Sequence, residues 1–316
     1  MPAPLPEFDD VLAAAARIAP HARVTPVLRS TSLDALAGAE LHLKAEHLQR
    51  SGAFKFRGAC NAVWSLGAEE AATGVVTHSS GNHGAALALA ARTRGIACHV
   101  VVPEGAVASK LAAISRYGGV LHRCAASIDA REQACAELQR QTGALLVHPY
   151  ADPRVIAGQG TAAMELLNAV AALDLLVVPV GGGGLAAGTA IAAAALAPAC
   201  KVLLAEPEGA ADTCRSLAAG ERRIDFIPDT VCDGLRGSLG APNFALLSKH
   251  AVEVLTVADR HTVEAMRLLW QTTKQVVEPS SAVALAAILQ HPARFAGLRV
   301  GVIVSGGNLD LDALPW

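Results

Sequence analysis

Short runs of valine, isoleucine and leucine alternate along the chain with longer, alanine-rich stretches. A continuous apolar run bounded by turn residues predicts a buried strand, and a longer periodic stretch predicts a helix. The predicted strands cover residues 74–80, 97–104, 144–149, 173–180, 201–208 and 298–308, and the predicted helices cover residues 83–95, 108–119, 131–143, 160–172, 185–197 and 259–275. Apolar strands that alternate with helices indicate an α/β fold with open parallel sheets covered on both faces.

Three predicted strands end in loops of small residues, at 79–84, 181–188 and 305–308. Open parallel sheets bind ligands beyond the carboxyl ends of their strands, so these loops form the candidate site. Four consecutive glycines in the second loop precede a predicted helix. Their amide groups and the helix dipole favour an anion, whereas the alternative, a tight strand-to-helix turn, needs only one glycine. The loop therefore predicts a phosphate site.

Composition excludes several classes of protein. With 316 residues, 52% of them hydrophobic and 17% charged, the chain can build a large core in one or two domains. A net charge of −2, no basic run and 3% aromatic residues exclude a nucleic-acid-binding face. Seven dispersed cysteines indicate reduced thiols and a cytoplasmic protein. The apolar stretch from Leu175 to Lys201 is long enough to resemble a membrane span, but its prolines and glycines favour a strand, a loop and a helix.

Two cofactors compete for the glycine loop. Gly182, Gly184 and Ala187 satisfy the G-x-G-x-x-A pattern of dinucleotide sites, with Glu206 in the next predicted strand as a ribose ligand. That pattern predicts a nicotinamide-dependent oxidoreductase. However, any run of four glycines meets it easily, and it gives no role to Lys55 or to the two serine-containing loops.

Pyridoxal 5'-phosphate is the alternative that uses all of these residues. It needs a lysine for its Schiff base, a phosphate cradle, a partner for the pyridine nitrogen and a pocket for the substrate carboxylate. Lys55 lies between Phe54 and Phe56, whose apolar surroundings are expected to lower the pKa of its amine. The glycine loop suits the phosphate, and the remaining roles suit Ser305 for the ring nitrogen and Ser79, Ser80 and Asn82 for the carboxylate.

Several motifs follow one another in order from about residue 25 to residue 310. They are TPVLRSTSLD, LKAEHLQRSGAFKFRGA, SSGNHGAALA, HPYADPRVIAGQGT, VVPVGGGGLAAG, AEPEGAAD, EPSSAVALAA and VSGGNLD. In these motifs the chain resembles the serine/threonine dehydratase and serine racemase family of pyridoxal-phosphate enzymes, which have the tryptophan synthase β-like fold. The resemblance implies a large domain of residues 1–72 and 149–316, a small domain of residues 73–148, and the cofactor in the cleft between them. It also implies a homodimer that acts on a small amino-acid substrate.

The resemblance assigns the cofactor contacts. It implies that Lys55 binds the cofactor as a Schiff base and moves the α-proton, while Phe54 packs on the cofactor. The other implied contacts are Asn82 at the 3-hydroxyl oxygen, Gly181, Gly182, Gly183 and Gly184 at the phosphate, Gly234 beside the cofactor and Ser305 at the pyridine nitrogen. Because a serine cannot hold that nitrogen protonated as a carboxylate does, the ring is a moderate electron sink, which suits β-elimination and proton exchange.

A second catalytic residue and a metal site are also implied by the resemblance. Ser80 matches the residue that exchanges a proton opposite the lysine in racemases; the alternative is that Ser80 or Asn82 caps the following helix. Glu206, the Ala210 carbonyl and Asp212 match the family's divalent-cation site, whose oxygen ligands suit Mg²⁺, Mn²⁺ or Ca²⁺. The alternative for this segment is a solvated acidic loop.

The expected substrate pocket draws on three segments of the chain, and its residues are Ser79, Ser80, Asn82, His83, Arg131 and Tyr150. Arg131 matches an arginine that contacts substrate in racemase-like members; the alternative is a helix-face arginine paired with a neighbouring glutamate. Tyr150 stands where those members often carry asparagine. Because the loop at 79–82 already suits an α-carboxylate, Arg131 favours a substrate with a second carboxylate, such as 3-hydroxyaspartate.

The expected reaction is elimination of water from a β-hydroxy amino acid, which yields a 2-oxo acid and ammonia. Candidate substrates are threo-3-hydroxyaspartate, serine and threonine. The alternative within the family is amino-acid racemisation by Lys55 and Ser80. The alternatives outside it are a nicotinamide-dependent dehydrogenase and a catalytically silent binding protein of the same fold, which would be expected to lack the lysine.

Overall fold

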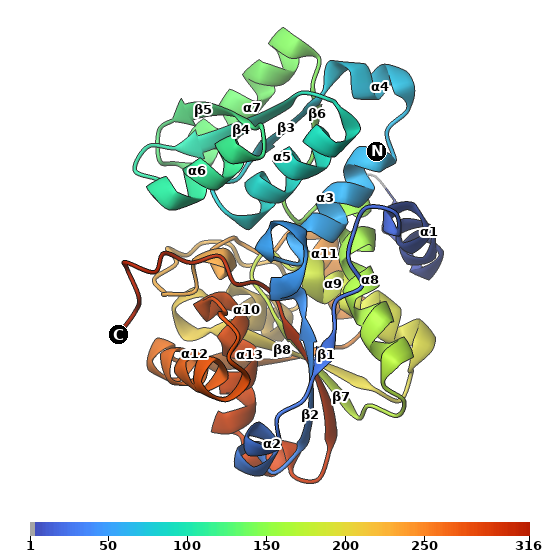
Figure 1. Cartoon of the computed structure of the whole chain (residues 1–316), viewed down its shortest axis with the longest axis vertical. Coiled ribbons are helices and arrows are strands. Elements are labelled where there is room, and N and C mark those ends of the chain that lie inside the picture. Colours follow the sequence, from blue (N-terminus) through green and yellow to red (C-terminus); the bar gives the residue numbers. More distant parts are fainter. Residues whose placement is uncertain (1–3) are drawn as a thin grey trace.

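The computed structural model describes residues 4–316 and contains two β-sheets, which lie one above the other in Figure 1. The larger sheet has six strands in the order β1-β2-β10-β7-β8-β9. They are β1 (Val27–Leu28), β2 (Glu40–Ala45), β7 (Leu175–Pro179), β8 (Lys201–Pro207), β9 (Glu253–Val257) and β10 (Arg299–Val304). Every pair in this sheet is parallel except β1 and β2, which are antiparallel.

The smaller sheet has four parallel strands in the order β5-β4-β3-β6. They are β3 (Val75–His78), β4 (Cys98–Pro103), β5 (Val120–Cys124) and β6 (Leu145–Leu146). All four lie between residues 75 and 146, and the strands of the larger sheet lie outside this range. The predicted α/β fold with open parallel sheets is confirmed, while the domain boundaries at residues 73 and 148 stay a prediction.

Helices cover both faces of each sheet, as the apolar strands predicted. Neighbouring residues of a strand point to opposite faces: Val177 packs in one apolar cluster with α13, and Val178 packs in another with α9. In the smaller sheet, Val100 packs with α5 and Val101 with α7. The helices are α1 (Phe8–Ile18), α2 (Thr31–Ala37), α3 (Lys55–Trp64), α4 (Ala68–Thr73), α5 (Asn82–Arg94), α6 (Ala108–Arg116), α7 (Ile128–Thr142), α8 (Pro153–Ala169), α9 (Gly184–Leu196), α10 (Asp212–Ala219), α11 (Ala241–Lys249), α12 (Asp259–Thr273), α13 (Pro279–Gln290) and α14 (Pro292–Phe295).

Helix α3 connects the two sheets and begins where they meet (Figure 1). Phe56 and Val63 of α3 are fully buried in one cluster with Leu87 of α5 and Val155 of α8. The stretch from Leu175 to Lys201 forms β7, the glycine loop and α9, as predicted. Within residues 4–316, none of the helices combines the length and the apolar character that a membrane crossing requires.

Candidate active site

Lys55 is the first residue of α3. Its Nζ donates a hydrogen bond to the Pro149 carbonyl oxygen at 3.0 Å and lies 5.1 Å from the centre of the Phe54 ring. Burial lowers the pKa of the Lys55 amine to about 8, although the charge of Glu278 opposes this change. A larger share of the amine is therefore uncharged at neutral pH than in an exposed lysine, as a nucleophile requires.

The start of α3 is tied to the residues that follow β10. The amide of Phe54 donates to the Ser305 carbonyl at 2.9 Å, and Ala53 forms an antiparallel bridge with Gly306. These contacts bring Ser305 and Lys55, which are far apart in the sequence, to the same site.

Two serines in the first turn of α13 form hydrogen bonds with two further predicted site residues, Ser305 and Gly234. Ser305 is 3% exposed, and its Oγ lies 3.0 Å from the Oγ of Ser281. The Ser281 Oγ also accepts a hydrogen bond from the Gly306 amide at 2.6 Å. The neighbouring Ser280 Oγ accepts one from the amide of Gly234 at 3.0 Å. Ser280 and Ser281 thus position Gly234 and Ser305 together.

The four glycines form the turn between β7 and α9. Gly183 has a φ of 90°, in the left-handed region that favours glycine. A Cβ atom on Gly182 would meet the Tyr150 ring at 2.4 Å, and one on Gly183 would meet the Asn243 Cβ at 2.8 Å. Within residues 4–316, no protein acceptor takes the amide hydrogens of these four glycines. Free amides before the 13-residue helix α9 fit a phosphate group.

Asn82 is held by side chains from the other end of the chain. Its Nδ2 donates to Glu278 Oε1 at 2.9 Å, and its Oδ1 accepts from Asn308 Nδ2 at 2.9 Å. The same Asn308 nitrogen donates to the Ser51 carbonyl at 2.7 Å. Glu278 is 2% exposed, and burial, helped by the charge of Asp233, raises the pKa of its carboxyl to about 8. This carboxyl is therefore mostly protonated at neutral pH.

The loop before α5 carries Ser79 and Ser80. The N-cap residue of α5 is Gly81, and no side chain caps the helix. The alternative that Ser80 or Asn82 caps α5 is therefore wrong. The Ser79 Oγ accepts a 3.4 Å hydrogen bond from the Gly81 amide, while no hydrogen bond within residues 4–316 uses the Ser80 side chain.

Three buried or partly buried histidines, His78, His83 and His148, lie near the loop before α5 and are uncharged at neutral pH. The ring of His148 makes edge contacts with His78 and with Tyr150, at centroid distances of 5.1 and 4.6 Å. Burial lowers the pKa of His148 to about 4, and burial together with the charge of Arg131 lowers that of His78. His83 is 1% exposed, and burial holds its pKa well below the usual value. None of the three carries a positive charge at neutral pH.

Arg131 lies in the second turn of α7 and is half-buried. Its Nε is buried without a hydrogen-bond partner in the described chain, and its charge acts on both His78 and Tyr150. The ion pair on α7 joins Arg140 to Glu137 instead. Among the described residues Arg131 forms no ion pair with a neighbouring glutamate, so that alternative is wrong. Burial raises the pKa of Tyr150, so its hydroxyl keeps its hydrogen.

The predicted metal ligands Glu206 and Asp212 are both fully buried. The two carboxylate oxygens of Glu206 accept hydrogen bonds from the amides of Thr213 and Cys214 at 2.8 and 2.9 Å. The Asp212 Oδ2 accepts from the Leu239 amide at 2.7 Å, and its Oδ1 has no partner among the described residues. Burial raises the pKa of Glu206 to about 7 and that of Asp212 to about 6.

This burial corrects two expectations about Glu206. A solvated acidic loop is wrong, because neither carboxylate is exposed. A ribose contact is wrong too, because Glu206 is fully buried and offers no accessible surface to a ligand of that size. In the part of the chain that the structure describes, no cluster of three or more acidic, histidine or cysteine side chains could hold a metal. The orphaned Asp212 oxygen and the buried Ala210 nevertheless fit a cation that completes its shell with water.

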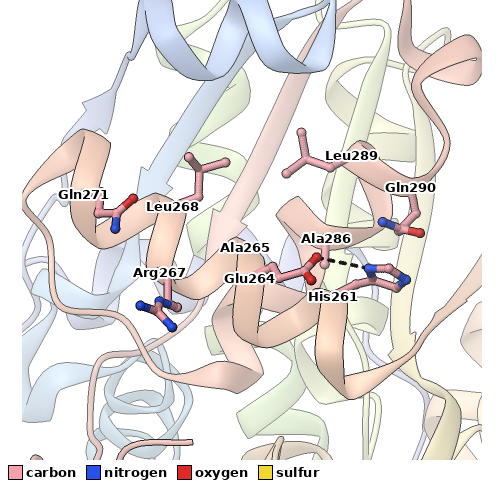
Figure 2. Close-up of a pocket in the computed structure, with 9 residues that line it drawn as sticks. All are labelled: His261, Glu264, Ala265, Arg267, Leu268, Gln271, Ala286, Leu289 and Gln290. Atoms are coloured by element: carbon pink, nitrogen blue, oxygen red, sulfur yellow. Dashed lines mark hydrogen bonds and ion pairs between the residues drawn. The ribbon is translucent and has the colours of Figure 1, made fainter. Parts of the chain in front are cut away.

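One hollow on the surface of the protein lies away from these predicted site residues. It has a volume of about 460 Å³ and lies between α12 and α13, with Leu268 and Leu289 in its lining and a 3.2 Å contact between His261 and Glu264 at one end (Figure 2). It contains no predicted site residue. The site is therefore defined by its converging polar groups and not by the size of an open cavity.

Comparison with known proteins decides between the two cofactors. Residues 18–306 match the family described as pyridoxal-phosphate dependent enzyme. The chain belongs to this family. It is 50% identical over 312 residues to a β-hydroxyaspartate dehydratase of Paracoccus denitrificans, covering 99% of each chain. It is 46% identical over 309 residues to a serine racemase of Dictyostelium discoideum, covering 96% of this chain and 95% of the relative.

Maize serine racemase has a solved structure with the same fold, at a TM-score of 0.95 and 44% identity, covering 98% of this chain and 95% of that one. The protein is therefore a pyridoxal-phosphate enzyme with the tryptophan synthase β-like fold, as the motifs predicted. The nicotinamide-dependent alternative is wrong.

The sequence-based prediction assigned no role to five residues of the site: Asn243, Glu278, Ser280, Ser281 and Asn308. Three of them lie in EPSSAVALAA, where polar residues open an otherwise apolar helix, a pattern that could have marked them. Asn308 is the last residue of the predicted loop at 305–308, but the prediction gives it no role. Asn243 lies in an ordinary amphipathic stretch, and nothing in the local pattern distinguishes it.

Proposed function

We propose that this enzyme removes water from threo-3-hydroxyaspartate and releases oxaloacetate and ammonia. The observation that carries the proposal is Arg131, a half-buried arginine whose Nε has no hydrogen-bond partner among the described residues and whose charge acts on His78 and Tyr150. The 50% identity with a β-hydroxyaspartate dehydratase supports the same substrate class.

The charges around Arg131 favour a substrate with two carboxylates. His78 and His148 are uncharged and Tyr150 is protonated, so these neighbours do not compensate the guanidinium charge. A carboxylate can bind both arms of the guanidinium fork and accept a further hydrogen bond from the Tyr150 hydroxyl. The loop at residues 79–82 opens α5 and suits the α-carboxylate. Serine and threonine offer no second carboxylate for Arg131.

The residues of the site then divide the chemistry. When bound, pyridoxal phosphate withdraws electrons from the substrate α-carbon. Lys55, whose amine has a lowered pKa, removes the α-proton as a general base. The β-hydroxyl leaves and takes up a proton to become water. The enamine product hydrolyses to oxaloacetate and ammonia, so one water molecule is lost and one is consumed.

Steady-state kinetics on two substrates test this proposal. We expect kcat/KM for threo-3-hydroxyaspartate to exceed that for L-serine by about tenfold or more, because a charge-assisted hydrogen bond contributes about 1.5–3 kcal/mol. Arg131→Lys should lower the hydroxyaspartate value more than the serine value, because an ammonium group cannot copy the fork. The matched control is Arg140→Lys on the same helix, which should change neither value. A preference for serine or threonine, or an equal loss on both substrates, would contradict the proposal.

Racemisation is the second candidate, and Ser80 favours it. Its hydroxyl is not engaged in capping α5 and makes no hydrogen bond within residues 4–316, so it is free to exchange a proton. The 46% identity with a serine racemase supports this second activity. Lys55 and Ser80 would act on opposite faces of the substrate α-carbon.

A divalent cation, a homodimer and a cytoplasmic location complete the proposal. The unpaired Asp212 oxygen beside buried Glu206 supports the cation, with Mg²⁺, Mn²⁺ or Ca²⁺ as candidates. Val24 and Leu48 are apolar residues that are 82% and 38% exposed, which supports an apolar contact between two copies that light scattering would test. The free thiols of all seven cysteines support a reducing compartment.

A further inference from the structure

Asn243 binds a carbonyl group of the glycine loop, whereas the phosphate is expected at the amide groups of that loop. It lies in α11 and has no exposed surface. Its Nδ2 donates to the Gly182 carbonyl at 2.5 Å and to the Tyr150 carbonyl at 2.9 Å. The reverse orientation of the amide would place its oxygen against these two carbonyl oxygens, so the hydrogen bonds require the orientation described.

The Gly182 carbonyl has two donors and is firmly fixed. The amide of Gly240 donates to it at 3.1 Å, in addition to the Asn243 Nδ2. In a planar trans peptide, the carbonyl oxygen of one residue and the amide hydrogen of the next point in opposite directions. Holding the Gly182 carbonyl towards α11 therefore aims the Gly183 amide hydrogen away from α11, to the open side of the loop.

Apart from the longer hydrogen bond from the Gly240 amide, the Asn243 Nδ2 is what fixes this peptide plane. Gly182 and Gly183 lack side chains, and glycine reaches left-handed and right-handed conformations at similar cost. The φ of 90° at Gly183 is one of several values open to such a pair. Without the Asn243 donor, only the 3.1 Å hydrogen bond from Gly240 holds the plane between Gly182 and Gly183, which can then rotate more easily and turn the Gly183 amide away from the phosphate.

The Asn243 side chain also binds the segment that carries the hydrogen-bond acceptor of Lys55. Tyr150, whose carbonyl is the second acceptor of Asn243, follows Pro149, whose carbonyl accepts the hydrogen bond from Lys55 Nζ at 3.0 Å. Asn243 thus links the segment that holds the amine to the loop that holds the phosphate.

We propose that Asn243 is a positioning residue that aims the Gly183 amide at the cofactor phosphate. This inference rests on the family's cofactor and is independent of the amino-acid substrate. It predicts a selective effect: loss of the Asn243 amide should weaken binding of pyridoxal 5'-phosphate much more than binding of pyridoxal, which lacks the phosphate.

The experiment measures both affinities on the full-length protein after its cofactor has been removed by dialysis. Asn243→Asp keeps the shape of the side chain but replaces the donor with oxygens that repel both carbonyls. We expect pyridoxal 5'-phosphate to bind about tenfold to a hundredfold more weakly, and pyridoxal to bind within about threefold of the native protein. These limits follow from the loss of one charge-assisted hydrogen bond.

Two further variants keep the result interpretable. Asn243→Ala tests the same loss without added charge, in case the aspartate variant does not fold. The matched control is Asn61→Asp, since Asn61 is 3% exposed and its Nδ2 donates to the Arg154 carbonyl at 2.7 Å, away from the glycine loop. The control should alter thermal stability without changing the ratio of the two affinities. An unchanged ratio in both Asn243 variants would overturn the proposal, because a purely structural asparagine would weaken both ligands alike.

Discussion

The buried charge cluster behind the active lysine gives a strong prediction about stability. Arg57, two residues after Lys55, is fully buried. Its guanidinium binds Glu46 through contacts of 2.7 and 2.8 Å and Glu165 through contacts of 2.6 and 2.8 Å. Lys44 Nζ contacts Glu165 at 2.5 Å. Two positive and two negative charges therefore cancel in a cluster in which Lys44, Arg57 and Glu46 are buried and Glu165 is partly exposed.

Replacing Arg57 with methionine leaves this cluster with one negative charge in excess. Removal of one partner from a buried ion pair costs about 3–5 kcal/mol, because the remaining charge is not compensated. Glu46 is fully buried and cannot turn to solvent, so we expect the upper part of this range. The double variant Arg57→Met with Glu46→Gln restores neutrality and should recover much of the loss.

The loss should also depend on pH. Burial acts to raise the pKa of Glu165, but the hydrogen bonds and charges of Arg57 and Lys44 outweigh it and lower the pKa below 4.5. A lowered carboxyl pKa stabilises the folded state above the unfolded pKa, and this contribution disappears as the pH falls through the folded value. The difference between native protein and variant should therefore persist from pH 8 down to about 4.5 and narrow as the pH falls further, through the lowered pKa of Glu165.

Urea unfolding followed by circular dichroism at several pH values measures both effects. Arg140→Met is the control, because Arg140 and Glu137 form an exposed pair and should leave the midpoint unchanged. A loss below about 1 kcal/mol for Arg57→Met, or a loss independent of pH, would refute the reasoning.

Three further predictions concern the site itself. The rate at which cofactor binds to cofactor-free protein, followed by absorbance, should rise with pH and have a midpoint near pH 8. The reason is that the reaction needs the uncharged amine of Lys55, and burial lowers the pKa of this amine to about 8. A midpoint near pH 10.5 would contradict the lowered pKa. A chelator should lower the melting temperature and Mg²⁺ or Mn²⁺ should restore it, with no response in Glu206→Gln combined with Asp212→Asn. Ser80→Ala should abolish racemisation and reduce elimination by roughly tenfold or less, about 1.4 kcal/mol; equal loss of both activities would rule out Ser80 as the second base.

The parallel fold could be predicted because its central strands are apolar on both sides. The pattern does not predict four strands: β1, which has only two residues, and three strands that have polar residues for identifiable reasons. β5 and β9 are edge strands of their sheets and carry charged residues, such as Arg123 and Glu253. β2 is an inner strand, but His42 and Lys44 interrupt its apolar run, and Lys44 is buried only because Glu165 pairs with it. Such a pairing across 121 residues has no local signature in the sequence.

The residues of the site likewise fall into those that local sequence features could predict and those that they could not. Lys55 and the glycine loop could be identified because their chemistry depends on local features, namely an amine between aromatic residues and consecutive glycines before a helix. Asn243 and Glu278 could not, because each acts on a segment far away in the chain: Asn243 holds Gly182, and Glu278 holds Asn82. Their roles follow only from the packing of α11 and α13 against loops from other strands.

The position of β10 has a consequence for how the enzyme is made. This strand lies between β2 and β7 in the larger sheet, yet it comes after every other strand in the chain. While the ribosome is still making residues 299–304, β2 has only the two-residue β1 beside it, and β7 has only β8. Ser305 and Gly306, which anchor Phe54 and Ala53, emerge later still. Until residue 306 has left the ribosome, the growing chain therefore lacks the strand that joins the two parts of the larger sheet and the contacts that hold the start of α3, and with it Lys55, in place.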